Sequence, residues 1–456
     1  MGFLLCGITK VDVPLFVQSV MTVSPPPRNS VDPYGSMRYP EFRNLVFASF
    51  LLTIGLLAQE VAIGYELYRI THDPLALGLV GLIEAIPFIS LSLYGGHIAD
   101  RYSKRKTLLW SVTGIAASSL VLHFLSEQSN HLPQNALVWA IYATIFVIGL
   151  CRAFQSPTTS ALRAFLVPVS LYENASTWSS SSWQVGAIVG PGISGFLYAW
   201  LGFSNTLLVV VGLVAGALLL YGSIGEKPAV IEAAKERIVE SIKEGIRFVF
   251  KKKIILYSIS LDLFSVLFGG VVAILPIYAQ DILRVGAEGL GILRAAPSLG
   301  AVLTLMVLAR VSPMVHAWRN LLVVVVGFGV CIIVFALSPW LSLSVIALFL
   351  SGAFDSVSVI IRATILQIMT PDEIRGRVMA VNGIFLASSN ELGAFESGTA
   401  AKIMGTVPSA VFGGVMTLCI VGWMFFSSKD LLMTEIEHPR PAEYPKHGDA
   451  AKSSKN

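Results

Sequence analysis

Residues 96–106 read Gly96-His97-Ile98-Ala99-Asp100-Arg101-Tyr102-Ser103-Lys104-Arg105-Lys106 and join two long apolar runs. A connection this short has to turn at the lipid headgroups, where Lys and Arg meet anionic lipid. Asp100 can cap the N-terminus of a helix there. The stretch therefore predicts a membrane protein with two neighbouring spans and a charged turn between them.

The composition supports a membrane protein and offers no sign of an enzyme. Of 456 residues, 54% are hydrophobic and only 13% are charged, and the mean hydropathy is +0.72. Soluble domains carry about 25% charged residues. The four cysteines lie far apart, and the chain has no disulfide framework, metal-ligand spacing, phosphate loop or nucleophile elbow. We expect no enzymatic activity, no cofactor, no metal and no nucleic-acid partner.

Twelve apolar segments follow one another, each about 20 residues or longer and therefore able to cross a hydrocarbon core of roughly 30 Å. Lys and Arg of the connections gather on one side, which the positive-inside rule assigns to the cytoplasm. We expect an all-α protein of the cytoplasmic membrane with both termini in the cytoplasm. The segments lie at residues 44–68, 77–99, 107–125, 136–158, 175–200, 203–222, 254–279, 287–309, 319–338, 341–367, 377–402 and 407–427.

The second half of the chain repeats the first. Residues 153–156 (Ala-Phe-Gln-Ser) return at 353–356 (Ala-Phe-Asp-Ser), and similar matches join residues 181–188 to 388–395 and residues 81–87 to 291–297. All three offsets lie between 200 and 210 residues. Such a repeat predicts two pseudo-symmetric halves of six helices, related by an axis along the membrane normal, with substrate bound between them.

Two of these stretches resemble motifs of the major facilitator superfamily. The turn at 96–106 resembles its signature loop, with Ser103 where a glycine is usual, and its gate residues would be Gly96, Asp100, Arg101, Lys104 and Arg105. The fifth segment resembles its antiporter motif, with Ser194 replacing a glycine, through Gly186, Gly190, Pro191 and Gly195. Small residues four apart let helices approach closely. Ordinary helix packing is the alternative interpretation of the second motif.

Arg152 and Gln155 resemble the Arg-x-x-Gln motif that the superfamily associates with proton coupling. An arginine inside lipid costs about 3 kcal/mol or more, so it should face the interior and have a partner. A structural arginine bound to backbone carbonyls is the alternative. Residues 161–195 and 241–247 resemble the enterobactin-exporter and multidrug-efflux subgroup. That resemblance implies export of a siderophore or drug-like molecule.

Several further charged residues fall inside the apolar segments. A carboxylate in lipid pairs with a cation or takes up a proton. Glu391 is our first candidate for the coupling site because its own span offers no basic partner. Asp355 comes second, because Arg362 lies two turns away on the same face. Glu66 is expected to be solvated. The remaining candidates, each of which could instead hold the bundle by hydrogen bonds, are Glu60, Glu84, Asp262 and Arg294.

We therefore expect a secondary transporter that exports a small hydrophobic or amphipathic molecule by alternating access, in exchange for protons and in contact with membrane lipids. A lysophospholipid or lipid flippase, and a receptor or scaffold on the same fold, remain alternatives. The expected parts are an N-terminal extension that is disordered or a start-site artefact (1–37), an N-terminal half (38–222), an amphipathic cytoplasmic linker (223–253), a C-terminal half (254–428) and a cytoplasmic tail (429–456).

Overall fold

The computed structural model describes residues 32–128, 131–227, 238–310, 313–314 and 316–431, and every regular element within these ranges is a helix. The prediction of an all-α fold is confirmed. The long helices are α1 (Pro40–Thr71), α2 (Pro74–Arg101), α3 (Lys104–Glu127), α4 (Gln134–Arg163), α5 (Tyr172–Gly222), α6 (Ile238–Lys251), α7 (Lys253–Gly269), α9 (Gly286–Leu308), α10 (Ala317–Leu337), α11 (Leu341–Met369), α12 (Asp372–Met404) and α13 (Thr406–Ser427).

Ten segments of the described chain are long and apolar enough to cross a membrane. One of them, Val169–Gly222, contains the kinked helix α5, whose Gly202 has a φ of 77° that a helix cannot contain. This kink lies between the two spans predicted at 175–200 and 203–222. Helix α12 has 33 residues and is not among the ten, which are counted over the described residues only. Its polar side chains line the centre of the molecule, as shown below. The exact count of twelve spans stays a prediction.

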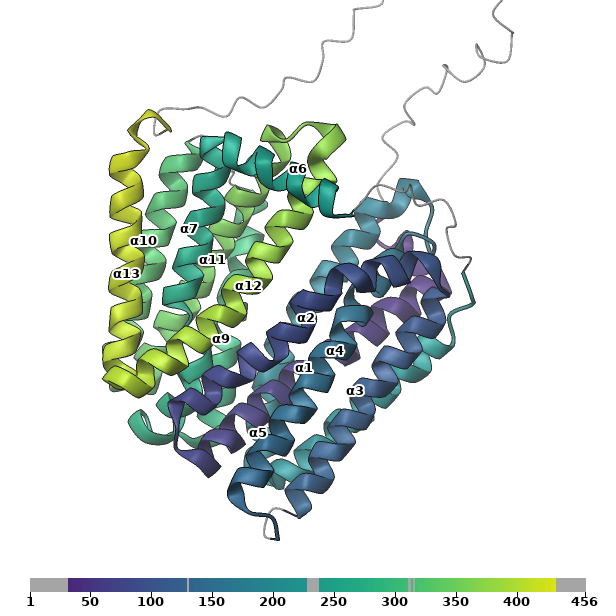
Figure 1. The fold of residues 1–456 in the computed structure, drawn as a ribbon, viewed down its shortest axis with the longest axis vertical. Helices are drawn as coiled ribbons and strands as arrows, with labels where there is room; N and C mark the ends of the chain where they lie inside the picture. The colour runs from purple at the N-terminus through teal and green to yellow at the C-terminus, as the bar shows by residue number, and fades with distance from the viewer. Residues whose placement is uncertain (1–31, 129–130, 228–237, 311–312, 315, 432–456) are drawn as a thin grey trace, which may run out of the picture.

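The helices form two bundles that meet at one end and separate at the other (Figure 1). Helices α1–α5 make the N-terminal bundle, and α7 with α9–α13 makes the C-terminal one. They touch where α2 packs on α12 and where α5 packs on α9. At the first contact, a Cβ on Gly78 would lie 3.1 Å from the Phe395 carbonyl oxygen. The open end carries α6, the start of α1 and the end of α13.

Two segments outside the bundles attach to them. Helix α6 packs on α12, where a Cβ on Gly245 would lie 2.9 Å from the Arg377 carbonyl oxygen. Residues 228–237 of the predicted linker lie outside the described residues. At the N-terminus, Trp178 of α5 donates a hydrogen bond to the Pro33 carbonyl at 2.9 Å, and its ring lies 5.6 Å from that of Tyr34. The packed chain therefore begins before Met37.

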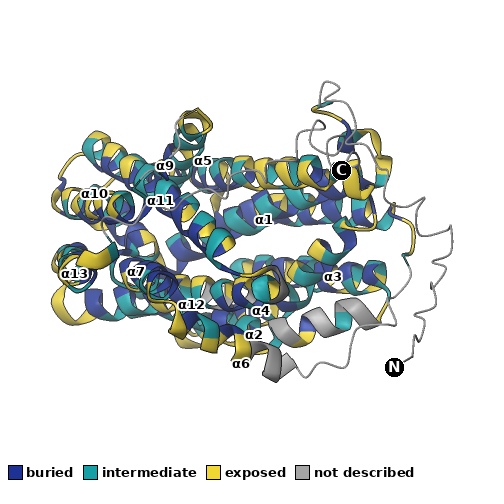
Figure 2. Ribbon diagram, turned by 90° about the horizontal axis from the view of Figure 1, so that it is seen from above, coloured by how far each residue is buried: buried dark blue, intermediate teal, exposed yellow. Residues whose placement is uncertain are grey.

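The outward faces of the helices carry many exposed residues (Figure 2). Large apolar side chains are prominent among them, and such a surface is unfavourable in water. A hydrocarbon environment suits it, which fits a multi-pass membrane protein. Examples come from both bundles: Trp110, Trp139, Leu219, Val323 and Trp423.

Candidate functional site

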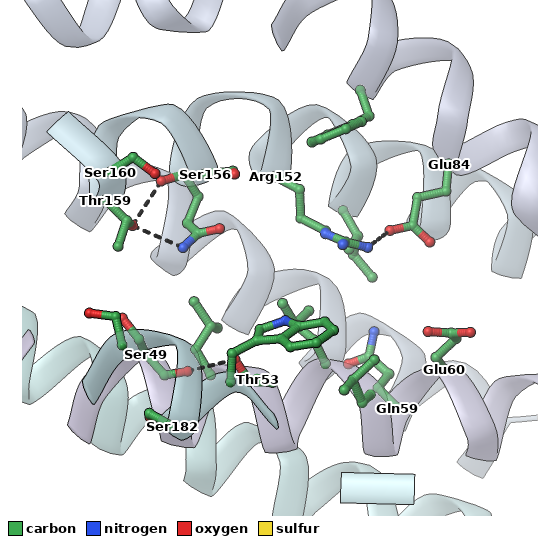
Figure 3. Close-up of a pocket in the computed structure, with 18 of the residues that line it drawn as sticks. Ser49, Thr53, Gln59, Glu60, Glu84, Arg152, Ser156, Thr159, Ser160 and Ser182 are labelled. Carbon is green, nitrogen blue, oxygen red and sulfur yellow. Dashed lines mark hydrogen bonds and ion pairs between the residues drawn. The ribbon is translucent and has the colours of Figure 1, made fainter. Parts of the chain in front are cut away.

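Two neighbouring cavities occupy the middle of the molecule. The first, of about 280 Å³, lies within the N-terminal bundle between α1, α2, α4 and α5 (Figure 3). The second, of about 250 Å³, lies between the two bundles. They adjoin each other, because four residues line both: Glu60, Val80, Glu84 and Arg152. A molecule in the N-terminal bundle would therefore touch the charged groups at the junction of the halves.

Two ion pairs stand at this junction. Arg152 of α4 pairs with Glu84 of α2 inside the N-terminal bundle, and the Arg152 side chain keeps 39% of its surface exposed to the cavity. Arg294 of α9 pairs with Glu60 of α1 across the two bundles, with 3.0 Å between Nη1 and Oε1. The first contact supplies the partner that an arginine at membrane depth requires. The second pair can hold only when α1 and α9 are close.

Glu391 of α12 is the third acid at the junction. Its carboxylate lies against Gly81 of α2, where an added Cβ would be 3.1 Å from Oε2. Both residues line the second cavity. Among the described residues, none forms an ion pair or a hydrogen bond with the Glu391 carboxylate. The junction thus holds three carboxylates and two guanidinium groups.

Asp262 and Asp355 lie elsewhere, in a cluster inside the C-terminal bundle. Arg362 of α11 pairs with Asp262 of α7 and lies 3.8 Å from Asp355, measured from Nη2 to Oδ1. The space beside them is only about 10 Å³, enough for one water molecule. The predicted Asp355–Arg362 contact is present. Neither aspartate lines the two central cavities.

Gln155 lines the first cavity, and its amide donates to the Thr159 hydroxyl at 3.0 Å. This amide is therefore partly engaged within its own helix. Four other polar residues of α4 line the same cavity but were missed by the sequence analysis: Ser156, Thr159, Ser160 and Arg163. Their spacing from Arg152 is a signal that could have found them, since residues four and three apart share a helix face.

The glycines of the fifth segment serve two different contacts. A Cβ on Gly186 would lie 2.9 Å from Thr53, and one on Gly190 would lie 3.0 Å from the Ile54 carbonyl, so both pack on α1. Pro191 is buried in the same helix. Gly195 instead faces the other bundle, where its Cβ would lie 2.4 Å from the Ala287 carbonyl oxygen. Only Gly195 of the three therefore acts at the contact between halves.

The predicted gate lies at the open end. Helix α2 continues to Arg101, but the side chains of Gly96, Asp100 and Arg101 lie outside the described residues. Lys104 is buried, with Nζ 4.7 Å from the centre of the Phe165 ring. Arg105 donates to the Gly222 carbonyl at the end of α5. The two basic residues join α3 to its neighbours. The partner of Asp100 stays a prediction.

The expectation for Glu66 was wrong. This carboxylate is buried, receives two hydrogen bonds from Arg69 at 2.7 and 2.8 Å, and also accepts one from Tyr198 of α5. It lies near the end of α1, and the start of that helix is at the open end of the molecule. Helix packing covers the carboxylate there. The apolar pattern of α1 could not show that an arginine one turn away turns back to it.

The described residues contain no group of three or more His, Cys, Asp or Glu side chains that could hold a metal ion.

Comparison with known proteins gives consistent matches along the chain. A family model described as transmembrane secretion effector matches residues 31–447. The enterobactin exporter EntS of Escherichia coli (strain K12) is 27% identical over 413 residues, covering 88% of this chain and 94% of that exporter. The enterobactin exporter EntS of Citrobacter koseri is 28% identical over the same shares of the two chains.

Solved structures match the fold at lower identity. A bacterial homologue of the human lysosomal transporter Spinster, in an inward-facing and unoccupied conformation, gives a TM-score of 0.68 at 14% identity. The match covers 88% of this chain and 99% of that one. At this identity the likeness concerns the fold alone.

Proposed function

Because the chain belongs to the transmembrane secretion effector family of the major facilitator superfamily of transporters, we propose that it is a proton-driven exporter of a small amphipathic molecule. The relatives are named for export of enterobactin, which supports a siderophore or drug-like cargo. The open end carries Arg105 and Lys106, which supports a cytoplasmic position for it in the cytoplasmic membrane. Cargo would enter from that side.

The observation that carries proton coupling is the position of Glu391. It shares the second cavity with two arginines that already have carboxylate partners, Arg152 with Glu84 and Arg294 with Glu60. A third carboxylate without an ion-pair partner of its own, inside the molecule, is a group that can bind and release a proton. Such a group at the junction of two halves is what a proton-coupled carrier requires.

The same geometry links the proton to the movement of the halves. Ionised Glu391 competes with Glu60 and Glu84 for the two guanidinium groups, whereas protonated Glu391 leaves both pairs undisturbed. The Glu60–Arg294 pair bridges the bundles, so weakening it favours their separation at the closed end. Release of the proton would therefore bias the carrier toward opening on that side, and reloading would bias it back.

Efflux from vesicles with an imposed pH gradient tests this proposal. Wild type should concentrate a fluorescent amphipathic cargo only while the gradient lasts. Glu391→Gln keeps the shape of the side chain, so it should still move cargo downhill but no longer respond to the gradient. Glu288→Gln is the matched control, because Glu288 is exposed in the first turn of α9 and lines neither cavity.

Gradient-driven efflux that is unchanged in Glu391→Gln would exclude Glu391 as the coupling site. The same vesicles separate the alternatives. Scrambling of a labelled lysophospholipid without movement of soluble cargo would identify a flippase. The absence of both movements in correctly inserted protein would identify a receptor or scaffold.

A further inference from the structure

One face of α4 carries a polar stripe along the first cavity, formed by Arg152, Ser156, Ser160 and Arg163. Spacings of four, four and three residues place these side chains on one side of a helix. Figure 3 shows Ser160, Ser156 and Arg152 following one another along the cavity wall. At 1.5 Å per residue the stripe is about 16 Å long. Arg163 is the last residue of α4, and its neighbour Leu162 belongs to one core cluster with Phe42 and Leu45 near the start of α1, which lies at the open end.

Arg163 is the member of the stripe that lacks a counter-charge. The acids that line the first cavity are Glu60 and Glu84, and each already pairs with another arginine. Within the described residues, nothing accepts a hydrogen bond from Arg163, and its Nε is buried without a partner. An unpaired buried donor is unfavourable. Arg163 lines the cavity, so a ligand there can bring an acceptor to its guanidinium group.

The two serines of the stripe are also available to a ligand. Ser156 and Ser160 are exposed, and no hydrogen bond to another described side chain or carbonyl occupies their hydroxyls. The hydroxyl of Thr53 on α1, which lines the same cavity, differs because it donates to the Ser49 carbonyl at 2.8 Å. Donors in one row, with a guanidinium group at each end, suit an acidic group that moves along α4.

Another part of the lining suits an apolar body. Trp183 of α5 lines the cavity and keeps 57% of its surface exposed. An indole face of this kind stacks on flat or aromatic groups. The first cavity thus combines unsatisfied donors on α4 with an exposed aromatic surface on α5.

We propose that the stripe Arg152-Ser156-Ser160-Arg163 binds the acidic group of an amphipathic anion, a carboxylate, phosphate ester or phenolate, whose flat apolar body lies against Trp183. Arg163 captures the acid at the open end, and the serines pass it toward Arg152. This assignment rests on the export function proposed above and adds the charge of the cargo to it.

Binding to the purified full chain in a non-ionic detergent tests the assignment without any gradient. The probes are 2-naphthoic acid and 2-naphthamide, which share one ring system and differ in charge. Wild type should bind the acid at least about ten-fold more tightly, as a charge-assisted hydrogen bond predicts. Arg163→Gln should remove most of that preference, and Arg163→Lys should keep part of it. Ser160→Ala should weaken acid binding by a smaller factor.

Arg43→Gln is the matched control, because Arg43 is exposed on α1 and lines neither central cavity. Equal affinities of the acid and the amide for wild type would overturn the assignment. So would an acid preference that survives in a folded Arg163→Gln protein. Competition by phosphatidylglycerol but not by phosphatidylcholine vesicles would keep the anion site and assign it to a lipid headgroup. Because the assay needs no proton movement, its result is independent of the Glu391 test.

Discussion

In the N-terminal half, the stripe of α4 lines a cavity of about 280 Å³. The residues 200 positions later on α11 are Gly352, Ser356, Ile360 and Ala363. Gly352 packs directly on α9, where a Cβ would lie 2.0 Å from the Pro297 carbonyl oxygen, and Ser356 donates to the Ala301 carbonyl at 3.4 Å. The same helical repeat therefore builds a cavity wall in one half and, at Gly352 and Ser356, a helix-packing contact in the other.

The arginines of the two halves also differ in their surroundings. Arg152 faces the cavity, whereas its counterpart on α11 is a glycine. Arg362 of α11 is buried beside Asp262, whereas its counterpart on α4 is the core residue Leu162. One half thus holds an ion pair that cargo can reach, and the other holds a pair enclosed by side chains. We expect the first to govern transport and the second to govern stability.

Arg362→Leu should have the largest effect on stability. Both partners of the Arg362–Asp262 pair have side chains only 10% exposed. Removing the guanidinium group leaves a buried carboxylate alone, which costs about 3–5 kcal/mol. Thermal unfolding in detergent, followed by circular dichroism, measures the loss. The double variant Asp262→Leu/Arg362→Leu removes both charges and should recover most of it. A double variant less stable than the single one would contradict a purely structural pair.

Arg152→Gln should cost less stability and more transport. The Arg152 side chain is 39% exposed, so water can replace part of the lost interaction with Glu84. We expect a loss of about 1.5–3 kcal/mol, the range for a hydrogen bond to a charged group. Efflux of an amphipathic cargo should nevertheless fall strongly. If Arg152→Gln lowers the stability of the protein as much as Arg362→Leu does, the exposure of the Arg152–Glu84 pair to the cavity does not make it less important for stability.

Gly195→Leu should impair the closed end where the halves meet. An added side chain would meet the Ala287 carbonyl at 2.4 Å and the Gly291 Cα at 2.8 Å on α9. Overpacking of this kind costs about 1–3 kcal/mol. Here it destabilises the arrangement in which α5 and α9 are in contact. Spin labels across the closed end should report a wider separation, with lower efflux. Gly212→Leu is the control, since no atom lies within 4 Å of its Cβ position.

Much of this fold could be predicted from the sequence, because the length of the apolar segments and the internal repeat can both be read directly from the order of the residues. The break near residue 202 fell between two predicted spans, and the charged residues at the junction were all among the candidates. Which acid binds which arginine could not be predicted. Glu84 binds Arg152, and Glu60 binds Arg294, because the rotation of each helix in its bundle decides which faces meet.

Arg163 is a residue whose position in the cavity could not be predicted from the sequence. It stands at the end of an apolar segment, where an arginine is ordinarily an interfacial residue in contact with headgroups. The order of the residues does not distinguish an interfacial arginine from an arginine that lines a cavity. The distinction required the neighbouring helices, which bury its Nε and supply no acceptor among the described residues.

The smallest effect is expected for Lys402→Ala. Lys402 of α12 reaches across the halves to Asp73, at 2.6 Å between Nζ and Oδ2, with side chains 49% and 34% exposed. Exposed pairs contribute about 0.2–1 kcal/mol and weaken with salt. The variant should shift the spin-label distances at the closed end slightly, and high salt should reproduce the shift in wild type.

Substitutions of Asp73 separate this bridge from a second role of the same side chain. Its Oδ1 accepts from the Leu75 amide at 3.0 Å and caps α2. Asp73→Asn keeps a capping oxygen but loses the charge, so it should behave like Lys402→Ala. Asp73→Ala loses both the charge and the capping oxygen. It should lower the free energy of unfolding by a further amount of about 0.5–2 kcal/mol, measured by thermal unfolding. If Asp73→Asn alone already gives the full loss, the bridge between the halves contributes more than an exposed ion pair can. The contact at the closed end would then rank beside Gly195 in holding the halves together.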